Sequence, residues 1–312
     1  MRYIVGVDLG GTNLRAALAD EQGTIYQVVR VPTAGDEGPE AVMDKIVACI
    51  GQVRAAMPRD GQLLGVGIGS PGPLDPFDGV VFTMPNLPGW ENVPLRAILE
   101  ERTGLPVELG NDANAAALGE WYFGAGRGLR NLVYVTVSTG IGGGVIADGR
   151  LLLGHRGAAA EVGHHIIDWE TLASWENLAA GPALARAAAE AMASNPHTLL
   201  HSLATPATVT AGDVARAAAA GDAVAQQLMD REGDLLGAGL VNMLHLYSPN
   251  LILLGGGVAI NNPQLIERAR RVIETRAMEA YRSVPVRLAE LGERAGLLGA
   301  VALFLHMREG RA

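Results

Sequence analysis

Near the start of the chain, apolar residues occur in short runs separated by polar breaks. Ile4–Asp8 is almost wholly apolar, while Asn13–Ala19 and Gly23–Val31 alternate between apolar and polar positions around a turn at Asp20–Gly23. Alternation of period two, bounded by Gly, Asn and Asp, is the pattern of β-strands. We therefore expect three consecutive antiparallel strands.

A helical period replaces this alternation from Pro39 onward. Between Pro39 and Met57, the residues Val42, Ile46 and Ile50 recur on one helical face. We predict further helices at Val93–Thr103, Ala113–Glu120, from Pro182, and at Asp222–Tyr247, Pro263–Glu279 and Gly296–Met307. Further strands are predicted at Leu63–Gly69, Val107–Leu109, Leu132–Ser138, Gly143–Ala147 and Leu251–Leu254. The chain from Ala147 to about Gly181 is expected to be irregular.

The break between the first two strands has the composition of a phosphate-binding turn. It contains Gly10, Gly11 and Thr12. Glycine tolerates positive φ and carries no Cβ, so backbone N–H groups can close on an anionic oxygen. Asp8, at the end of the first strand, is suited to a hydrated Mg²⁺, which nucleotide sites hold with one or two carboxylates and water. Taken alone, the segment is equally compatible with a simple tight hairpin.

Two later segments share features with this turn. Leu132–Val145 again reads as strand, Gly-rich turn and strand, and such internal repetition favours a paired binding function over a chance hairpin. Leu251–Val258 is a buried-looking strand that ends in three glycines, where a flat ring could approach the backbone.

In this order the three segments resemble the phosphate-1, phosphate-2 and adenosine motifs of the actin-like ATPase superfamily. The resemblance implies an α/β chain with the actin-like ATPase (ribonuclease H-like) fold, in which two lobes of mixed sheet and helices surround a central cleft. It implies a small lobe at residues 1–118, completed by a C-terminal helix at 297–312, and a large lobe at 119–296. It also implies an ATP site made of Asp8, Gly10, Gly11, Thr12, Asn13, Thr139, Gly140, Gly142, Gly255, Gly256 and Gly257.

Other motifs narrow the resemblance. The segments Pro85–Trp90, Gly110–Ala116 and Glu161–His164 are similar to the sugar-binding and catalytic motifs of the ROK family, and closely to those of its glucokinases. The resemblance implies transfer of the γ-phosphate of ATP to the 6-hydroxyl of glucose, with Mg²⁺ as cofactor. Kinases for mannose, fructose or an N-acetylhexosamine, and a sugar-sensing protein without turnover, remain as alternatives.

Asp112 is the residue we expect to be catalytic. It lies where a strand ends and a helix begins, a position that taken alone favours a role as the cap of that helix. Ligands of open α/β sheets bind at the carboxyl ends of strands, which favours a site role as well. We expect Asp112 to bind the sugar and act as general base, and Asn111 to orient it.

Glu161 and His164, spaced i, i+3, should share one face of a turn, and Gly163 between them would admit a ligand. A sugar hydroxyl both donates and accepts hydrogen bonds, which suits a carboxylate beside a histidine, although an ordinary surface ion pair has the same spacing. The ROK resemblance makes both residues sugar ligands, together with Asn86 and Glu176.

The chain departs from the ROK pattern between these residues. Three zinc-binding cysteines usually lie between the Gly-His pair and the later glutamate, and residues 165–175 contain none. We expect no structural zinc. Asp168, Glu170 and His165 are the alternative metal ligands in this segment, although acidic and histidine residues on a loop are usually solvated.

Composition excludes several classes of function. The net charge of −9, from 33 acidic and 24 basic residues, disfavours nucleic acid and anionic membranes as partners. Lys45 is the sole lysine and follows no Gly-rich loop, which excludes a Walker A site, and Cys49 has no disulfide partner. Because the chain opens on its first strand without a signal peptide, we expect a cytoplasmic protein without the DNA-binding domain of ROK repressors. We also expect a homodimer. Glycines 124, 126 and 128 are the expected hinge between lobes.

Overall fold

The computed structural model describes residues 1–84 and 87–309 of the chain. They form two compact units, each built from separate stretches of sequence. Unit 1 comprises Met1–Leu129, Gly144–Ala160 and the chain from Glu290 onward, and unit 2 comprises Arg130–Gly143 and Glu161–Ala289. The first stretch of unit 1 ends at Leu129. The expected lobe boundary at residue 118 stays a prediction.

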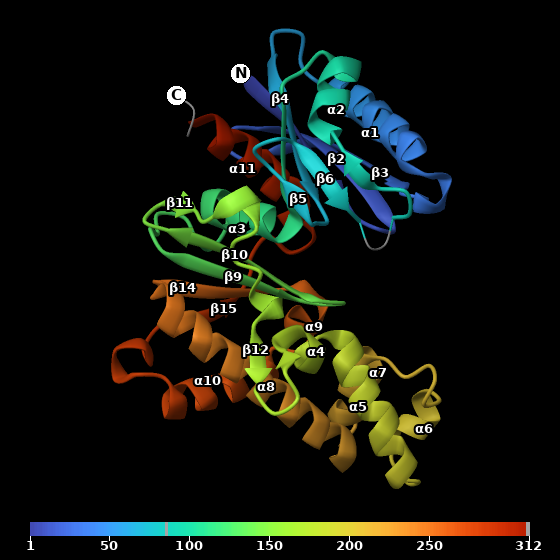
Figure 1. Cartoon of the computed structure of the whole chain (residues 1–312), viewed down its shortest axis with the longest axis vertical. Helices are drawn as coiled ribbons and strands as arrows, with labels where there is room; N and C mark the ends of the chain where they lie inside the picture. The colour runs from blue at the N-terminus through green and yellow to red at the C-terminus, as the bar shows by residue number, and fades with distance from the viewer. Residues whose placement is uncertain (85–86, 310–312) are drawn as a thin grey trace. The chain divides into compact units, whose positions relative to one another are not determined.

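Unit 1 is built on a five-stranded mixed sheet (Figure 1). Its strands are β1 (Arg2–Leu9), β2 (Asn13–Asp20), β3 (Ile25–Pro32), β4 (Gln62–Ser70) and β8 (Val107–Asn111), in the order β3-β2-β1-β4-β8. The first three pair antiparallel, as the alternation predicts, and β4 and β8 join in parallel.

Successive residues of β1 face opposite sides of this sheet, and each side is covered by a different helix. Val5 and Val7 belong to the core that includes α1 (Pro39–Arg54), whereas Ile4 packs with Val301 of α11 (Ala295–Glu309). A Cβ on Gly67 of β4 would collide with the backbone of α11, so glycine permits this close packing. The predicted return of the last helix to the N-terminal sheet is thereby confirmed.

The other elements of unit 1 are α2 (Leu95–Thr103), α3 (Asp112–Phe123), a small sheet of β5 (Leu74–Asp75), β6 (Val80–Thr83) and β7 (Glu91–Val93), and 3-10 turns at Gly35–Glu37, His155–Gly157 and Gly292–Arg294. A short hairpin joins β10 (Ile141–Ala147) to β11 (Arg150–Leu151), and of β10 the residues Ile141–Gly143 belong to unit 2.

Unit 2 has a parallel sheet in which β14 (Leu251–Gly255) lies between β9 (Leu132–Val137) and β15 (Val286–Leu288). Its helices are α4 (Trp175–Ala179), α5 (Gly181–Ser194), α6 (Leu200–Leu203), α7 (Ala211–Ala219), α8 (Ala223–Tyr247), α9 (Gly256–Ile260) and α10 (Gln264–Arg276). A hairpin of β12 (Ile166–Asp168) and β13 (Ala173–Ser174) and 3-10 turns at Val162–His164 and Glu279–Tyr281 complete it.

One sequence prediction was wrong. The expected irregular chain before Gly181 contains β11, the β12–β13 hairpin and α4. The short elements β5–β7, β15, α6 and α9 were not predicted, and the consecutive glycines before α9 are poor helix formers. The other predicted helices and strands are confirmed, with shifts at their ends.

The Gly-spaced segment after α3 is organised by Glu120, which is fully buried. Its carbonyl accepts hydrogen bonds from the N–H groups of Gly124 and Gly126, and its carboxylate accepts from Ala125 at 3.1 Å and Leu291 at 2.8 Å. A hinge in this segment remains a prediction. Across the described residues, every helix is too short or too polar to cross a lipid bilayer.

Candidate functional site

The first Gly-rich turn is held from outside by Thr33, a buried residue at the end of β3. The Thr33 N–H donates to the Thr12 carbonyl at 2.9 Å, and its hydroxyl donates to the Gly10 carbonyl at 2.7 Å. The Lys45 ammonium in turn donates to the Thr33 carbonyl at 3.1 Å. These bonds fix the turn and leave Thr12 exposed at its tip.

Glycine at position 10 serves a different purpose from the one expected. Its backbone is not in the left-handed region, and its N–H donates to the Asn13 carbonyl at 3.0 Å. A Cβ there would lie 3.1 Å from that carbonyl oxygen, so the requirement is for a close approach within the turn.

Asp8 does not stand alone at the end of β1. Its Oδ2 accepts hydrogen bonds from Nε and Nη2 of Arg15, its direct neighbour on β2, and Arg15 also donates to the Glu293 carbonyl. A Cβ on Gly296, at the start of α11, would collide with the Asp8 carboxylate. A pocket of about 410 Å³ opens here, lined by Asp8, Gly10, Thr12, Asn13, Arg15, Arg30 and Glu293.

The sequence left Asp112 two roles, helix cap and site residue. In the structure the cap is its neighbour Asn111. Asn111 is the N-cap of α3, and its Oδ1 accepts from the N–H groups of Ala113 at 2.9 Å and Asn114 at 3.2 Å. Asp112 is the first residue of the helix, exposed, with its own Oδ1 accepting from Ala113 at 2.8 Å. The Asp112 carboxylate thus lies at the positive end of the helix dipole, beside the cap that Asn111 provides.

The second Gly-rich turn, in unit 2, is closed by a hydrogen bond from the Ser138 N–H to the Gly140 carbonyl at 2.9 Å. Ser138 and Thr139 are exposed. A Cβ on Gly140 would collide with the Glu176 carboxylate, whose Oε2 accepts the Ile141 N–H at 2.8 Å. Glu176 is therefore joined to this turn, and Gly142 follows within β10.

The three glycines at the end of β14 and the start of α9 have separate roles. A Cβ on Gly255 would collide with the Tyr134 hydroxyl, and Gly256 has a φ of 81°. Gly257 has no close neighbour and lines a pocket of about 750 Å³. Only this last glycine meets the expectation of an open backbone surface for a flat ring.

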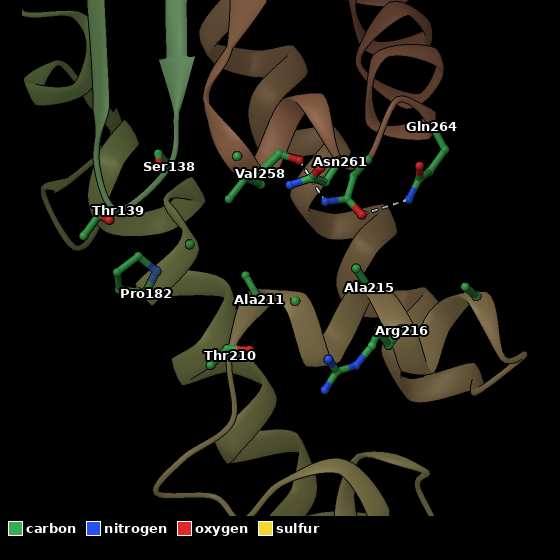
Figure 2. Close-up of a pocket in the computed structure, with 15 residues that line it drawn as sticks. Ser138, Thr139, Pro182, Thr210, Ala211, Ala215, Arg216, Val258, Asn261 and Gln264 are labelled. Carbon is green, nitrogen blue, oxygen red and sulfur yellow. Dashed lines mark hydrogen bonds between the residues drawn. The ribbon is translucent and has the colours of Figure 1, made fainter. Parts of the chain in front are cut away.

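Figure 2 shows this pocket with Ser138 and Thr139 on one side, Val258 and Asn261 on another, and α7 along a third. Apart from Arg216, the α7 residues that line it are small: Ala211, Gly212, Ala215 and Ala219. Among the described lining residues, Arg216 is the one that carries a charge.

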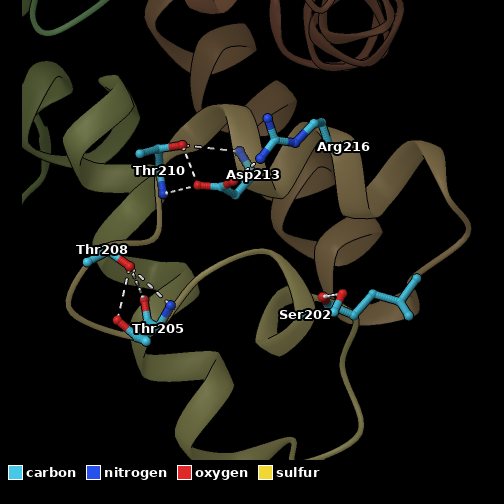
Figure 3. Close-up of polar contacts among 7 residues, drawn as sticks. Ser202, Thr205, Thr208, Thr210, Asp213 and Arg216 are labelled. Atoms are coloured by element: carbon cyan, nitrogen blue, oxygen red, sulfur yellow. Dashed lines mark hydrogen bonds and ion pairs between the residues drawn. The ribbon is translucent and has the colours of Figure 1, made fainter.

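Arg216 is anchored through a chain of polar contacts on α7 (Figure 3). The guanidinium pairs with the carboxylate of Asp213, which closes a capping box with Thr210 by accepting its N–H at 2.9 Å and its hydroxyl at 2.6 Å. The hydrogen bond from the Thr210 hydroxyl lowers the pKa of Asp213, so the anchor is charged at neutral pH.

Glu161 and His164 take the expected turn, with the His164 N–H donating to the Glu161 carbonyl at 3.1 Å and both side chains exposed. In a 3-10 turn, residues i and i+3 lie above one another. Gly163 is needed for another reason than ligand access, because a Cβ there would collide with the Ile141 carbonyl.

The alternative metal ligands of this segment do not come together. Asp168 accepts hydrogen bonds from the Thr171 hydroxyl at 2.7 Å and the Glu170 N–H at 3.0 Å, and the first of these lowers its pKa. The His165 ring bonds to the Val162 carbonyl instead. No cluster of three His, Cys, Asp or Glu suited to a metal is found within residues 1–84 and 87–309. Asn86, the remaining expected sugar ligand, lies outside the described residues.

Sequence reasoning missed Arg15, Thr33 and Arg216. Arg15 carried a detectable signal, since a charged residue on an otherwise apolar strand beside Asp8 calls for a partner. Thr33 and Arg216 carried none, because their contacts depend on how distant elements pack.

The sequence matches the ROK family over residues 4–307. It is 36% identical to a glucokinase of Thermotoga maritima over 310 residues, covering 96% of each chain. Its structure is similar to a ROK hexokinase from Thermus thermophilus, with 38% identity, a TM-score of 0.82 and coverage of 99% and 100% of the two chains.

A ROK family glucokinase from Streptomyces griseus, solved with glucose and AMPPNP, is 33% identical, with a TM-score of 0.80 and coverage of 96% and 98%. Proteins named xylose repressors also match, at lower identity. Residue motifs, fold and similarity thus agree over almost the whole length. The chain belongs to the ROK family.

Proposed function

We propose that this chain is an ATP-dependent glucokinase that transfers the γ-phosphate of ATP to the 6-hydroxyl of glucose. The pocket of about 750 Å³ in unit 2 carries the proposal. It begins at the exposed Ser138 and Thr139 of the second Gly-rich turn, and small side chains of α7 leave room for a flat base. Its volume is typical of small-molecule sites, which are roughly 300–1,000 Å³.

Asp112 is the proposed general base. Phosphoryl transfer passes through a loose transition state, so a kinase mainly aligns the hydroxyl and accepts its proton. The Asp112 carboxylate is exposed at a helix N-terminus, which suits a group that must meet a substrate hydroxyl. Asn111 holds the start of α3 in place, so that Asp112 is not needed as the cap.

Mg²⁺ is part of this proposal, and the donors around Asp8 suit it. Arg15 contacts only Oδ2 of the Asp8 carboxylate, and a single carboxylate with water is a usual Mg²⁺ environment on nucleotides. Asp8 would hold the hydrated ion, and the ion would neutralise phosphate charge. The exposed Thr12 and the turn at Gly10–Asn13 would contact phosphate oxygens.

Glu161, His164, Glu176 and Asn86 are the proposed sugar ligands. The two carboxylates accept hydrogen bonds from sugar hydroxyls, whereas the imidazole and the amide can each donate and accept. The solved Streptomyces griseus relative, with glucose and a nucleotide analogue, supports this choice of substrates. We also propose that the protein assembles as a homodimer. Light scattering on the purified protein would measure the mass of the assembly.

A coupled assay across glucose, mannose, fructose and N-acetylhexosamines, with ATP and polyphosphate in parallel, tests the proposal. We expect the highest kcat/KM with glucose and ATP. A higher kcat/KM with another hexose would make this a kinase for that sugar. Tight binding of a sugar without turnover by any donor would make it a sugar-sensing protein and overturn the proposal.

A further inference from the structure

The two groups of proposed sugar residues in unit 2 are joined by the β12–β13 hairpin. Glu161 and His164 precede it and Glu176 follows it. The hairpin closes at its base through a hydrogen bond from the Trp175 N–H to the His165 carbonyl at 2.9 Å. His165 directly follows His164 and Trp175 directly precedes Glu176, so this bond ties the two groups together.

The side chains of His165 and Trp175 reinforce that bond. Their ring centroids are 5.4 Å apart at an interplanar angle of 57°. The Nδ1 atom of His165 bonds to the Val162 carbonyl, and since a carbonyl only accepts, Nδ1 carries the proton. The imidazole is thereby fixed to the turn that holds Glu161 and His164.

Trp175 is fixed to the body of unit 2. Its indole is fully buried, and Nε1 donates to the Leu235 carbonyl of α8 at 3.0 Å. A Cβ on Gly239, one turn further along α8, would collide with the indole, so this glycine makes the space for it. Below, His165 and Trp175 together are called the His165–Trp175 clamp.

Both ends of the hairpin also contact the backbone of one residue, Ile141, which follows the second Gly-rich turn. Gly163 packs directly against the Ile141 carbonyl, and the Glu176 carboxylate accepts the Ile141 N–H at 2.8 Å. The positions of His164 and Glu176 relative to that turn therefore depend on the clamp.

We infer that the His165–Trp175 clamp is the device that positions His164 and Glu176 for recognition of sugar hydroxyls. The inference rests on the proposed function, which makes these two residues sugar ligands. In this inference, packed rings and hydrogen bonds orient His164 and Glu176, as a bound metal would otherwise do. His165 and Trp175 are positioning residues, because they act through their neighbours.

Conservative variants test the clamp. His165→Phe keeps a ring against Trp175 but removes the Nδ1 donor, and it also removes Nε2, which is buried without a hydrogen-bond partner among the residues that the structure describes. Trp175→Phe keeps an aromatic ring and removes the bond to Leu235. The matched control is Trp169→Ala, since Trp169 is 80% exposed at the tip of the same hairpin.

We expect each clamp variant to lower kcat/KM for glucose by roughly 10- to 100-fold, the usual cost of displacing a binding group by about 1 Å. The KM for ATP should stay within about twofold, since the nucleotide pocket is lined by other residues. The control should match the parent protein in both constants. Clamp variants that fold and keep the parent kcat/KM for glucose would overturn the inference, as would an equal rise in the KM for ATP.

Hydrogen exchange separates this inference from the proposed function. In the protein without ligands, the clamp variants should exchange the amides of residues 161–167 and 175–177 faster, and the control should not. If the parent protein binds no hexose, the proposed function fails while the exchange pattern still reports whether the clamp orders this segment. Unchanged exchange in both clamp variants would exclude the clamp, even in an active glucokinase.

Discussion

At the scale of single residues, the cap of α3 and the proposed general base are two neighbouring residues, Asn111 and Asp112. Asn111 caps α3, which leaves the Asp112 carboxylate exposed beside it. The two roles are therefore separable by mutation. Asn111→Ala should cost about 1 kcal/mol of stability through loss of the cap.

Asp112→Asn should remove catalysis without removing the fold. The change keeps the shape of the side chain and abolishes the charge and the proton acceptor. We expect kcat to fall by roughly 10²–10⁴, the usual range for loss of acid–base catalysis, with a small change in glucose affinity. Steady-state kinetics at saturating ATP would measure this, with Asp60→Asn, an exposed aspartate in a turn, as control. A variant within about tenfold of the parent would remove Asp112 from the role of base.

Asp8→Asn should raise the Mg²⁺ concentration needed for turnover. An amide is a weaker ligand for Mg²⁺ than a carboxylate, and it also loses the ion pair with Arg15. Initial rates across a Mg²⁺ titration at fixed ATP measure the effect, with melting temperature as the control for folding. An identical Mg²⁺ dependence in the variant would exclude Asp8 from the metal site.

The sequence identified residues by chemistry more readily than by partner. Asp8, Asp112, Glu161 and His164 were proposed as site residues because carboxylates and histidines stand where strands end or turns begin. The partner of Asp8 was not found, since pairing between β1 and β2 is set by their register. The reasons for individual glycines were also missed, because they depend on backbone segments that approach from elsewhere in the fold.

At the scale of elements, α8 shows how packing can override helix propensity. Alanine is favoured over glycine in a helix by about 1 kcal/mol. Gly51 of α1 has no neighbour within 4 Å of the Cβ it lacks, whereas Gly239 of α8 faces the Trp175 ring at less than that distance. The same substitution should therefore have opposite effects at the two positions.

Gly239→Ala should destabilise the protein by about 1–3 kcal/mol, the usual cost of overpacking a core. Gly51→Ala should stabilise it by about 0.5–1 kcal/mol. Urea denaturation of both variants against the parent measures the difference. Stabilisation by both substitutions would show that α8 can shift away from the indole at little cost.

A second feature of α8 predicts a pH dependence. Burial raises the pKa of Glu232 to about 8, and nearby Arg231 offsets only part of that rise. Because the folded state holds the proton more tightly than the unfolded state, stability should be highest below the ordinary glutamate pKa and should fall as pH rises towards 8. Glu232→Gln should remove this decline, which denaturation at pH 5, 6.5 and 8 would show. A parallel decline in both proteins would assign it to other groups.

Local pattern predicted most elements and failed where tertiary contacts decide. Apolar alternation and helical periodicity located β1–β4, α1, α8 and α11 to within a few residues. The β12–β13 hairpin was missed because its strands are only two or three residues long, too short for a periodic signal. Glycine content hid α9, which the turn at Gly256 and the packing of Val258 stabilise.

At the scale of the whole molecule, ROK membership and fold follow from the order of motifs, which local periodicity alone does not give. The family resemblance implied the return of the C-terminal helix to the N-terminal lobe, but the inclusion of residues 144–160 in that unit was not predicted. Residues 144–160 and the chain from Glu290 onward belong to the unit of the N-terminal sheet. Only contacts between distant segments, such as Leu291 with Glu120, show that assignment.

The whole protein should fold and function without zinc. Cys49 is the sole cysteine and is buried, and a structural zinc site usually needs several thiolate or imidazole ligands. Metal analysis after extensive chelation, followed by assay with Mg²⁺ alone, should show full activity. Zinc that copurifies in stoichiometric amount, and whose removal abolishes activity, would contradict this prediction.

The contact between Lys45 and Thr33 has a practical consequence for labelling. Lys45 carries the sole side-chain amine of the chain, and its ammonium bonds to the residue that braces the first Gly-rich turn. Acylating reagents and amine-coupled sensor surfaces will therefore attach at Lys45 or at the N-terminus. Binding measured on such surfaces would probe a protein tethered beside its proposed phosphate turn. Immobilisation through Cys49 or through an affinity tag avoids attachment at that turn. Because Cys49 is buried, the tag is the better choice.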